Sequence, residues 1–161
     1  MDFIITMVNV ILTIFSAVGA WNANKSYDKV KKVSIYSNTN IALLEMEKIE
    51  DVLIDLMKMA NESERRATNN RIKIKEYGEK IKKSLNIISN KLSSKDNKEI
   101  QQLLDYDGLN VEYYIDSFIT GSILVNEKFD IDENFQKCQQ SLKDIKNLLK
   151  DKLEERQGGL K

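Results

Sequence analysis

The sequence contains no histidine and no proline, and its 161 residues include one cysteine and six glycines. Without histidine there is no imidazole acid or base, no Ser-His or Cys-His nucleophile pair, and no Cys/His zinc site. The lone Cys138 excludes an intramolecular disulfide framework. No P-loop, dinucleotide-binding or EF-hand motif is present. We therefore expect neither an enzyme nor a bound cofactor or metal, and the scarcity of proline and glycine indicates long helices joined by short turns.

The longest uncharged segment, Phe3–Trp21, lies at the start of the chain and has 19 residues. As a helix it is about 28 Å long, close to the roughly 30 Å thickness of the hydrocarbon core of a bilayer. Trp21 suits the headgroup level, and four lysines follow it: Lys25, Lys29, Lys31 and Lys32. The positive-inside rule places the N-terminus outside and the rest of the chain in the cytoplasm. We predict a single-pass anchor in the cell inner membrane, in contact with lipid.

Two other interpretations of this segment stay open. A cleaved signal peptide normally carries its cations before the apolar run, although Val18-Gly19-Ala20 resembles a cleavage site. A buried helix of a soluble protein is the second alternative, and the length of the run and its lack of charge on every face argue against it.

Polar residues inside the segment follow one face of the predicted helix. This polar stripe is spaced by three, four and three residues and consists of Thr6, Asn9, Thr13 and Ser16. Ala20 and Ala23 continue the spacing. Since an unsatisfied amide is costly in hydrocarbon, an asparagine at this depth faces other helices or a water-filled cavity. The stripe predicts a homo-oligomer, in which its four residues are candidate pore-lining residues; a plain dimer or a chance scatter of polar residues is the alternative.

The rest of the chain carries apolar residues at heptad spacing, in stripes at Ala42–Ala60, Ile74–Leu92 and Ile131–Leu153. The anchor either passes straight into the first of these helices or breaks near Ser34–Asn40, where Ser, Asn and Thr compete for backbone hydrogen bonds. Asp105-Tyr106-Asp107-Gly108 is a predicted turn.

We predict an all-α protein, with an N-terminal transmembrane helix followed by a cytoplasmic helical bundle of four to five helices. The expected organisation is a transmembrane helix at 1–24, a juxtamembrane connection at 25–40, a bundle at 41–156 and a frayed tail at 157–161. Within the bundle, Ser93 and Asp96 are predicted to cap a short helix. Cys138 lies on an apolar stripe and is expected to be a buried hydrophobic residue.

The net charge of zero conceals two segments of opposite charge. Residues 58–91, the basic segment, contain 10 Lys and Arg against 4 Asp and Glu. Residues 92–137, the acidic segment, contain 4 against 10. The two segments either leave an anion-attracting surface or pack side by side and neutralise each other.

Three of the four arginines fall in or just after the polar segment Asn61–Asn70, which is predicted to be a turn. Arginine and asparagine are residue types that hold phosphate oxygens and base edges. The candidate nucleic-acid site is therefore Arg65, Arg66, Asn69, Asn70, Arg71, Lys73 and Lys75. In an oligomer this site is repeated around the axis, and a ring of cations binds a polyanion better than one turn does. A solvated surface is the alternative.

This architecture resembles small bacterial membrane effectors of antiphage defence, in particular the channel-forming effector of the Hailong system. The resemblance rests on Phe3–Trp21 with its polar stripe and on a helical remainder such as Ala42–Leu92. It implies a tetrameric ion channel held closed by single-stranded DNA oligomers that a partner nucleotidyltransferase makes. Phage nucleases destroy the DNA, and the open channel depolarises the cell. The resemblance also implies that the polar stripe lines the pore and that the basic turn contacts DNA.

Two functions are therefore considered for the chain. One is a homo-oligomeric membrane ion channel effector, gated by a polyanionic ligand such as single-stranded DNA. The alternative is a single-pass, membrane-tethered helical scaffold or adaptor that binds a protein partner, for example through a coiled-coil seam on Ala42–Ala60. The two differ at Asn9, because replacing this residue with leucine alters conduction only if it lines a pore.

Overall fold

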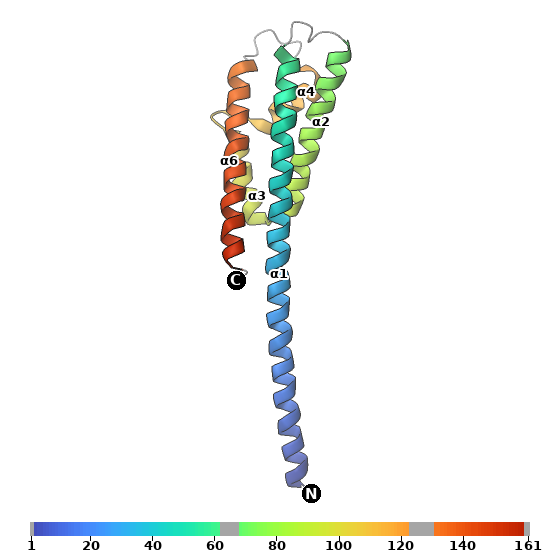
Figure 1. The fold of residues 1–161 in the computed structure, drawn as a ribbon, viewed down its shortest axis with the longest axis vertical. Helices are drawn as coiled ribbons and strands as arrows, with labels where there is room; N and C mark the ends of the chain where they lie inside the picture. The colour runs from blue at the N-terminus through green and yellow to red at the C-terminus, as the bar shows by residue number, and fades with distance from the viewer. Residues whose placement is uncertain (1, 62–67, 123–130, 160–161) are drawn as a thin grey trace.

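A computed structural model of the chain describes residues 2–61, 68–122 and 131–159. Side chains within these ranges are described from Leu12 onward, apart from those at 60–61, 68–69 and 131–132. The described residues form five helices and one small hairpin (Figure 1). These elements are α1 (Asp2–Asn61), α2 (Thr68–Lys91), α3 (Ser94–Leu104), β1 (Asp105–Tyr106), β2 (Leu109–Asn110), α4 (Val111–Thr120) and α6 (Ile131–Gly158). The prediction of a helical bundle is confirmed.

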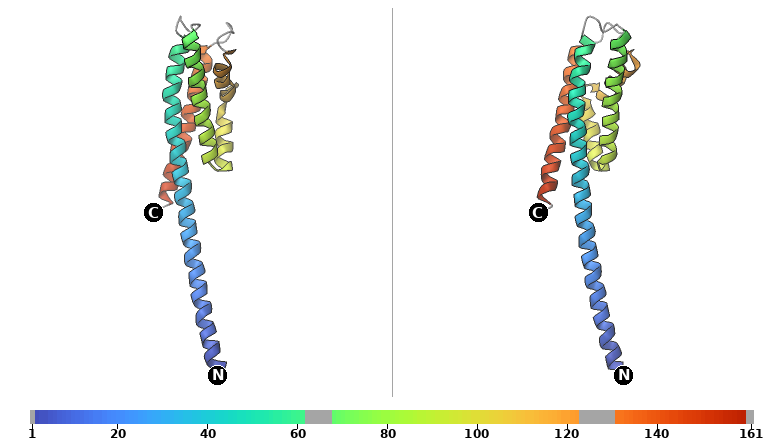
Figure 2. Two further views of the ribbon diagram at one scale, coloured as in Figure 1. Left: turned by 90° about the vertical axis from the view of Figure 1, so that its right-hand side faces the viewer. Right: turned by 45° about the vertical axis from the view of Figure 1, so that its right-hand side comes forward.

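Helix α1 continues through Ser34–Asn40 without a break. Of the two predicted alternatives for that region, the uninterrupted helix is the one that forms. Residues 12–35 of α1 are exposed throughout. Figures 1 and 2 show this part of the helix projecting from the end of the bundle at which the C-terminus lies. We call residues 2–35 the α1 stem.

Over the part of the chain that is described, no helix combines the length and the hydropathy needed to cross a membrane. The side chains of Phe3–Ile11, which form the first half of the predicted anchor, lie outside the described ones. The predicted divisions at 1–24 and 25–40 coincide with no boundary in the backbone, because α1 is helical across both.

The bundle is built on the second half of α1, which packs against α2 and α6. Helix α2 also packs against α4, and α3 against α6. The rings of Tyr114 and Phe118 meet edge to face at the centre of α4, with centroids 5.0 Å apart. The three predicted heptad stripes supply most of the core: Ala42, Met46, Ile49, Leu53, Leu56, Ile74, Ile81, Leu85, Ile88, Cys138, Leu142, Ile145 and Leu149. The period of the apolar residues therefore predicted which helical faces are buried.

Short polar residues fix the ends of the smaller helices. The Ser93 hydroxyl accepts a hydrogen bond from the backbone N–H of Asp96, which confirms the predicted cap of α3. The Asn110 side chain caps α4 in the same way, through the N–H of Tyr113. The predicted turn before it is also present, because Asp107 and Gly108 both have positive φ, at 46° and 76°. Two short strands flank this turn, β1 and β2, and they were not predicted.

Gly78 lets α2 and α4 approach closely. A Cβ atom added at Gly78 would lie 2.8 Å from Cγ1 of Ile119 and 3.5 Å from Cβ of Phe118. Because Cγ1 of Ile119 is near the backbone of α4, the helices would have to separate to accommodate a side chain at Gly78.

We expect Gly78→Ala to lower the free energy of unfolding by about 1–3 kcal/mol, because overpacking exceeds the gain of up to about 1 kcal/mol in helix propensity. Denaturant unfolding of the full chain, followed by far-ultraviolet circular dichroism, measures the change. The matched control is Gly158→Ala, whose added Cβ has no heavy atom within 4 Å. Equal stability of the two variants would contradict a close contact between α2 and α4.

Candidate functional site

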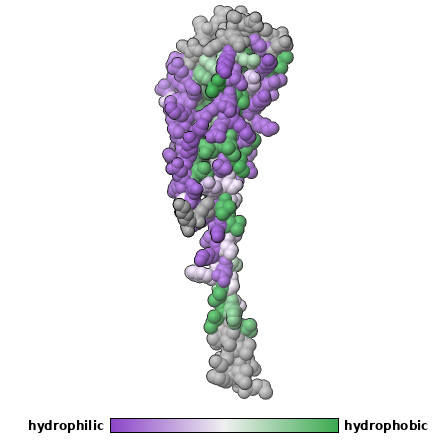
Figure 3. All heavy atoms as spheres, in the orientation of Figure 1, coloured by the Kyte–Doolittle hydropathy of each residue, from purple (hydrophilic) through white to green (hydrophobic). Residues whose placement is uncertain are grey.

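The predicted pore-lining residues belong to the α1 stem. The side chains of Thr6 and Asn9 lie outside the described residues, whereas Thr13 and Ser16 are exposed. Large apolar side chains around them are also exposed, by 52–74%: Leu12, Ile14, Phe15, Val18 and Trp21. Figure 3 shows apolar side chains where the described part of the stem begins, and both polar and apolar ones closer to the bundle. The described part of the stem therefore presents both Thr13 and Ser16 of the polar stripe and large apolar side chains to the surroundings.

Those of the predicted nucleic-acid residues that the structure describes lie at the far end of the bundle, where α2 begins (Figure 1). Arg65 and Arg66 are outside the described residues, as is the side chain of Asn69. Asn70 is half-buried. Exposed on the first turns of α2 are Arg71, Lys73 and Lys75.

The two predicted sites are far apart and joined by one element. At about 1.5 Å per residue, the part of α1 between Ser16 and Asn61 is roughly 65 Å long. The fold therefore does not combine the predicted pore residues and the predicted ligand residues into one site. Any influence of the far end of the bundle on the stem has to be transmitted along α1 or through the helices packed on it.

The basic and acidic segments meet at one ion pair among the described residues, in which Lys82 Nζ lies 2.6 Å from Asp116. Other acids of the acidic segment pair with lysines of α6 instead, as Asp107 does with Lys137 and Glu99 with Lys152. Several cations of the basic segment have no ion pair to a described residue: Arg71, Lys73, Lys80, Lys83 and Lys91. The acidic segment therefore neutralises only part of the charge of the basic segment, and the basic segment keeps a positively charged surface.

A groove between α1 and α2 gathers lysines that the sequence analysis did not single out. Lys48, Lys80 and Lys83 line it above a floor of buried isoleucines. Glu45 lies on the same wall, and hydrogen bonds from Lys48 at 2.6 Å and Ser84 at 2.7 Å hold the pKa of its carboxyl below the ordinary value. The spacing of Lys80 and Lys83 beside the predicted apolar stripe was the available signal, since residues three apart share a helix face.

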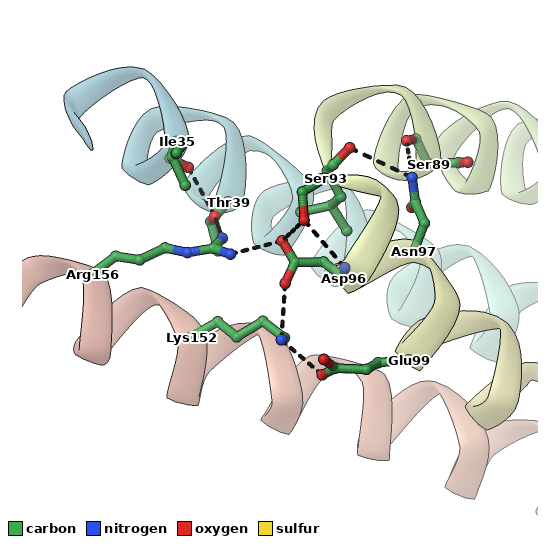
Figure 4. A network of polar contacts seen from close by, with 10 residues as sticks. Ile35, Thr39, Ser89, Ser93, Asp96, Asn97, Glu99, Lys152 and Arg156 are labelled. Atoms are coloured by element: carbon green, nitrogen blue, oxygen red, sulfur yellow. Dashed lines mark hydrogen bonds and ion pairs between the residues drawn. The ribbon is translucent and has the colours of Figure 1, made fainter. Parts of the chain in front are cut away.

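A buried ionic cluster lies at the other end of the bundle, where the α1 stem leaves it (Figure 4). Asp96, at the start of α3, is 3% exposed. Its carboxylate accepts hydrogen bonds from Lys152 at 2.9 Å, Arg156 at 2.7 Å and the Ser93 hydroxyl at 2.7 Å. Burial by itself raises the pKa of Asp96, but these three donors together hold it well below its ordinary value.

The same cluster reaches α1. Arg156 also donates to the hydroxyl of Thr39, and that hydroxyl donates to the backbone carbonyl of Ile35 at 2.9 Å. Lys32 Nζ donates to the backbone carbonyl of Gly159 at 3.3 Å. One carboxylate therefore ties together α3, the end of α6 and the base of the stem.

Sequence reasoning identified Asp96 as a helix cap but did not connect it with Arg156. Arg156 is the one arginine outside positions 65–71 in a chain that otherwise uses lysine for its cations. Because the guanidinium group forms several hydrogen bonds in fixed directions, a lone arginine among lysines was a signal for a buried pairing.

The described residues contain no group of His, Cys, Asp and Glu suited to hold a metal ion. Cys138 is fully buried, and burial raises the pKa of its thiol to about 12, so that it stays protonated at neutral pH. The prediction that Cys138 is a structural residue of the core is confirmed.

Comparisons with known proteins identify no relative: no protein-family model, curated protein or solved structure matches the chain.

The Asp96 cluster predicts sensitivity to acid. Because the pKa of Asp96 is lower in the folded chain than its ordinary value of 3.8, its stabilising contribution is complete above about pH 5 and is lost as the pH falls toward 2. At pH 7 we expect Asp96→Asn to lower the free energy of unfolding by about 3 kcal/mol, since Lys152 and Arg156 lose a buried anionic partner.

Denaturant unfolding at several pH values measures both effects. The stability of Asp96→Asn should fall less steeply below pH 5 than that of the unmodified chain. Asp144→Asn is a matched control, because Asp144 is half-buried on α6 and has a glutamine as its hydrogen-bond donor. Identical pH profiles for the unmodified chain and Asp96→Asn would contradict a low pKa of Asp96.

Proposed function

We propose that the protein is a homo-oligomeric membrane ion channel, in which the α1 stem anchors each copy as a single-pass helix and the bundle lies on the cytoplasmic side. The observation that carries the proposal is the concentration of exposed large apolar side chains on the described part of the stem. Phe15 is 71% exposed and Trp21 74%. Exposed apolar surface is unfavourable in water by about 25 cal/mol per Å², and a bilayer removes that surface from water.

The charges that follow the apolar run support the orientation. Lys25, Lys29, Lys31 and Lys32 lie between the apolar tip of the stem and the bundle, and they are exposed. Such a cluster favours the cytoplasmic side of an inner membrane. Trp21, next to it, suits the boundary between hydrocarbon and headgroups.

The polar stripe supports a pore at the centre of the oligomer. Thr13 and Ser16 are exposed in one chain and share the stripe with Thr6 and Asn9. Hydroxyl and amide groups on one face of a membrane helix face other helices or water rather than lipid. Several copies around an axis would enclose these groups in a narrow, uncharged path for ions.

The incompletely neutralised basic segment supports a polyanionic ligand such as single-stranded DNA. Arg71 and Lys73 lie in the first turns of α2 without an ion pair to any described residue, and Lys80 and Lys83 continue the positive surface along the α1–α2 groove. Repetition of this surface around the axis would give the avidity that a linear polyanion requires. The continuous α1 joins the ligand end to the pore end, so that binding can control opening.

In this proposal the protein is an effector of bacterial antiphage defence. A partner enzyme supplies the polyanion that holds the channel closed, and loss of the polyanion opens the channel and depolarises the cell. The alternative function is a membrane-tethered adaptor. It is favoured by a second groove, between α1 and α6, where exposed Ile54 adjoins the buried Leu53 and Leu142 and suits an amphipathic helix of a partner protein.

A pore predicts leakage of potassium from cells that express the full chain without any partner. We expect Asn9→Leu to change the leakage rate several-fold, because it removes an amide from the pore path. Ile14→Leu is the matched control, since Ile14 belongs to the stem but not to the polar stripe and is 58% exposed. Potassium release and membrane potential are measured together, with the membrane fraction checked for each variant.

Polarised cells with the full chain in the membrane fraction would contradict a free channel. Leakage that is the same for the unmodified chain and Asn9→Leu would contradict the pore-lining role of Asn9. An adaptor gives no leakage with any of these variants.

The basic surface predicts salt-dependent binding of a single-stranded oligothymidylate to the full chain. We expect Arg71→Glu with Lys73→Glu to weaken binding and to make the dependence of log K on log salt shallower by about 1.4, that is about 0.7 for each lost phosphate contact. Fluorescence anisotropy at several salt concentrations measures both quantities.

The matched control for this prediction is Lys98→Glu with Lys150→Glu, which changes the net charge equally at exposed positions on α3 and α6. Equal loss of binding in the two double variants would show that total charge, rather than the basic segment, attracts the oligonucleotide. Unchanged binding in Arg71→Glu with Lys73→Glu would exclude these residues from the site.

A further inference from the structure

The polar stripe of the stem does not end at the lysines. The same spacing of three and four residues continues through Ala20 and Ala23 and then along the part of α1 that approaches the bundle. The continuing residues are Tyr27, Val30, Ser34, Ser37, Ile41 and Leu44. We call the whole series, from Thr6 to Leu44, the α1 seam. Because α1 is unbroken, the seam stays on one gradually turning face of a single helix.

The polarity of the seam differs from that of the other faces of α1 in one direction before Trp21 and in the opposite direction after it. Near the N-terminus, the other described faces carry large apolar residues such as Ile14, Phe15 and Val18, and the seam there is the more polar face. After Trp21 the other faces carry Lys25, Asp28, Lys29, Lys31 and Lys32, and the seam there contains no charged residue.

A face that contacts lipid becomes apolar, and a face that contacts water becomes charged. The seam is more polar than the other faces where those faces are apolar, and it is uncharged where those faces are charged. It therefore behaves throughout as a face that contacts protein. In the part outside the proposed membrane segment, Tyr27 is 66% exposed, Val30 67% and Leu44 50%. No described element of the same chain covers these side chains.

The bundle lies on the other side of α1. Thr39, Ala42 and Met46 are fully buried against the rest of the bundle. Each of them is two residues from a seam residue, which is about 200° around the helix. From Tyr27 to Ser37 a helix that approaches along the seam therefore meets no obstruction from the bundle of the same chain, whereas Ile41, at the bundle end of the seam, is half-buried.

We propose that α1 packs against α1 of further copies of this chain along the seam, in parallel, so that residues 27–44 form a helical neck between the membrane and the bundles. The occupant is a second copy, because a helix in parallel register presents the same change from an apolar to a charged surface at the same height. Matching seams also place the polar stripe residues side by side, and polar residues at such positions fix register. This inference rests on the proposed function, for which it names the surface of assembly.

The contact along the seam needs both neighbours of a ring to cover an area comparable with one standard interface. Over the described side chains from Thr13 to Leu44 the seam is about 46 Å long, and helices that pack at about 10 Å cover a strip of roughly 460 Å² per contact. A copy in a ring has two such neighbours, so about 900 Å² of each helix is covered in total, while each single contact stays below the roughly 800 Å² per partner of a stable two-body interface.

Single-cysteine cross-linking of the full chain tests the neck. Val30→Cys and Ser37→Cys lie on the seam, and Lys29→Cys is a matched exposed control beside it. The native Cys138 is fully buried with a protonated thiol, so the unmodified chain serves as the blank. Each variant is oxidised with copper phenanthroline in membranes and in detergent, and the cross-linked dimer is measured on a non-reducing gel.

We expect about ten-fold more dimer at Val30→Cys and Ser37→Cys than at Lys29→Cys, because a disulfide needs Cβ atoms about 4 Å apart. Equal cross-linking at all three positions, or none at Val30 and Ser37, overturns the neck. The conservative Ser37→Cys keeps the test valid if Val30→Cys does not fold. Cross-linking without potassium leakage supports the neck and contradicts the channel. Leakage without cross-linking supports the channel and contradicts the neck.

Discussion

The continuity of α1 is the constraint on which the other features of the structure depend. One uninterrupted helix supplies a wall of the core with Ala42, Met46 and Ile49 and extends as the free stem. A break within Ser34–Asn40 would have left the direction of the stem independent of the bundle. Because the helix does not break, the orientation of each stem face is set by the packing of the bundle.

The Asp96 cluster strengthens this constraint where the stem leaves the bundle. A buried carboxylate needs several donors, and the donors come from α6 and from the cap of α3. Arg156 extends the cluster to Thr39 and so holds α1 close to the point where it leaves the bundle. A displacement of α6 or α3 would separate the buried carboxylate of Asp96 from its cations, which makes the cluster suited to couple the bundle to the stem.

The distribution of charge separates two roles within a neutral chain. Acids of the acidic segment pair with Lys137 and Lys152 of α6, which stabilises the fold. The cations of the basic segment lie along α2 with few acidic partners among the described residues, so their field is directed outward. The far end of the bundle is thus suited to attract an anion, while the end nearest the stem is held by internal ion pairs.

The heptad spacing of apolar residues determined the helical fold and the buried faces, because burial of one stripe per helix has the same period as the helix itself. Local capping chemistry likewise determined the start of α3 at Ser93 and the turn at Asp107 and Gly108. Only the tertiary structure decided that Arg156 would meet Asp96, that Lys80 and Lys83 would line a groove with Lys48, and that α2 would approach α4 at Gly78. These contacts join residues far apart in sequence, and their partners depend on how whole helices pack, which no local pattern of residues encodes.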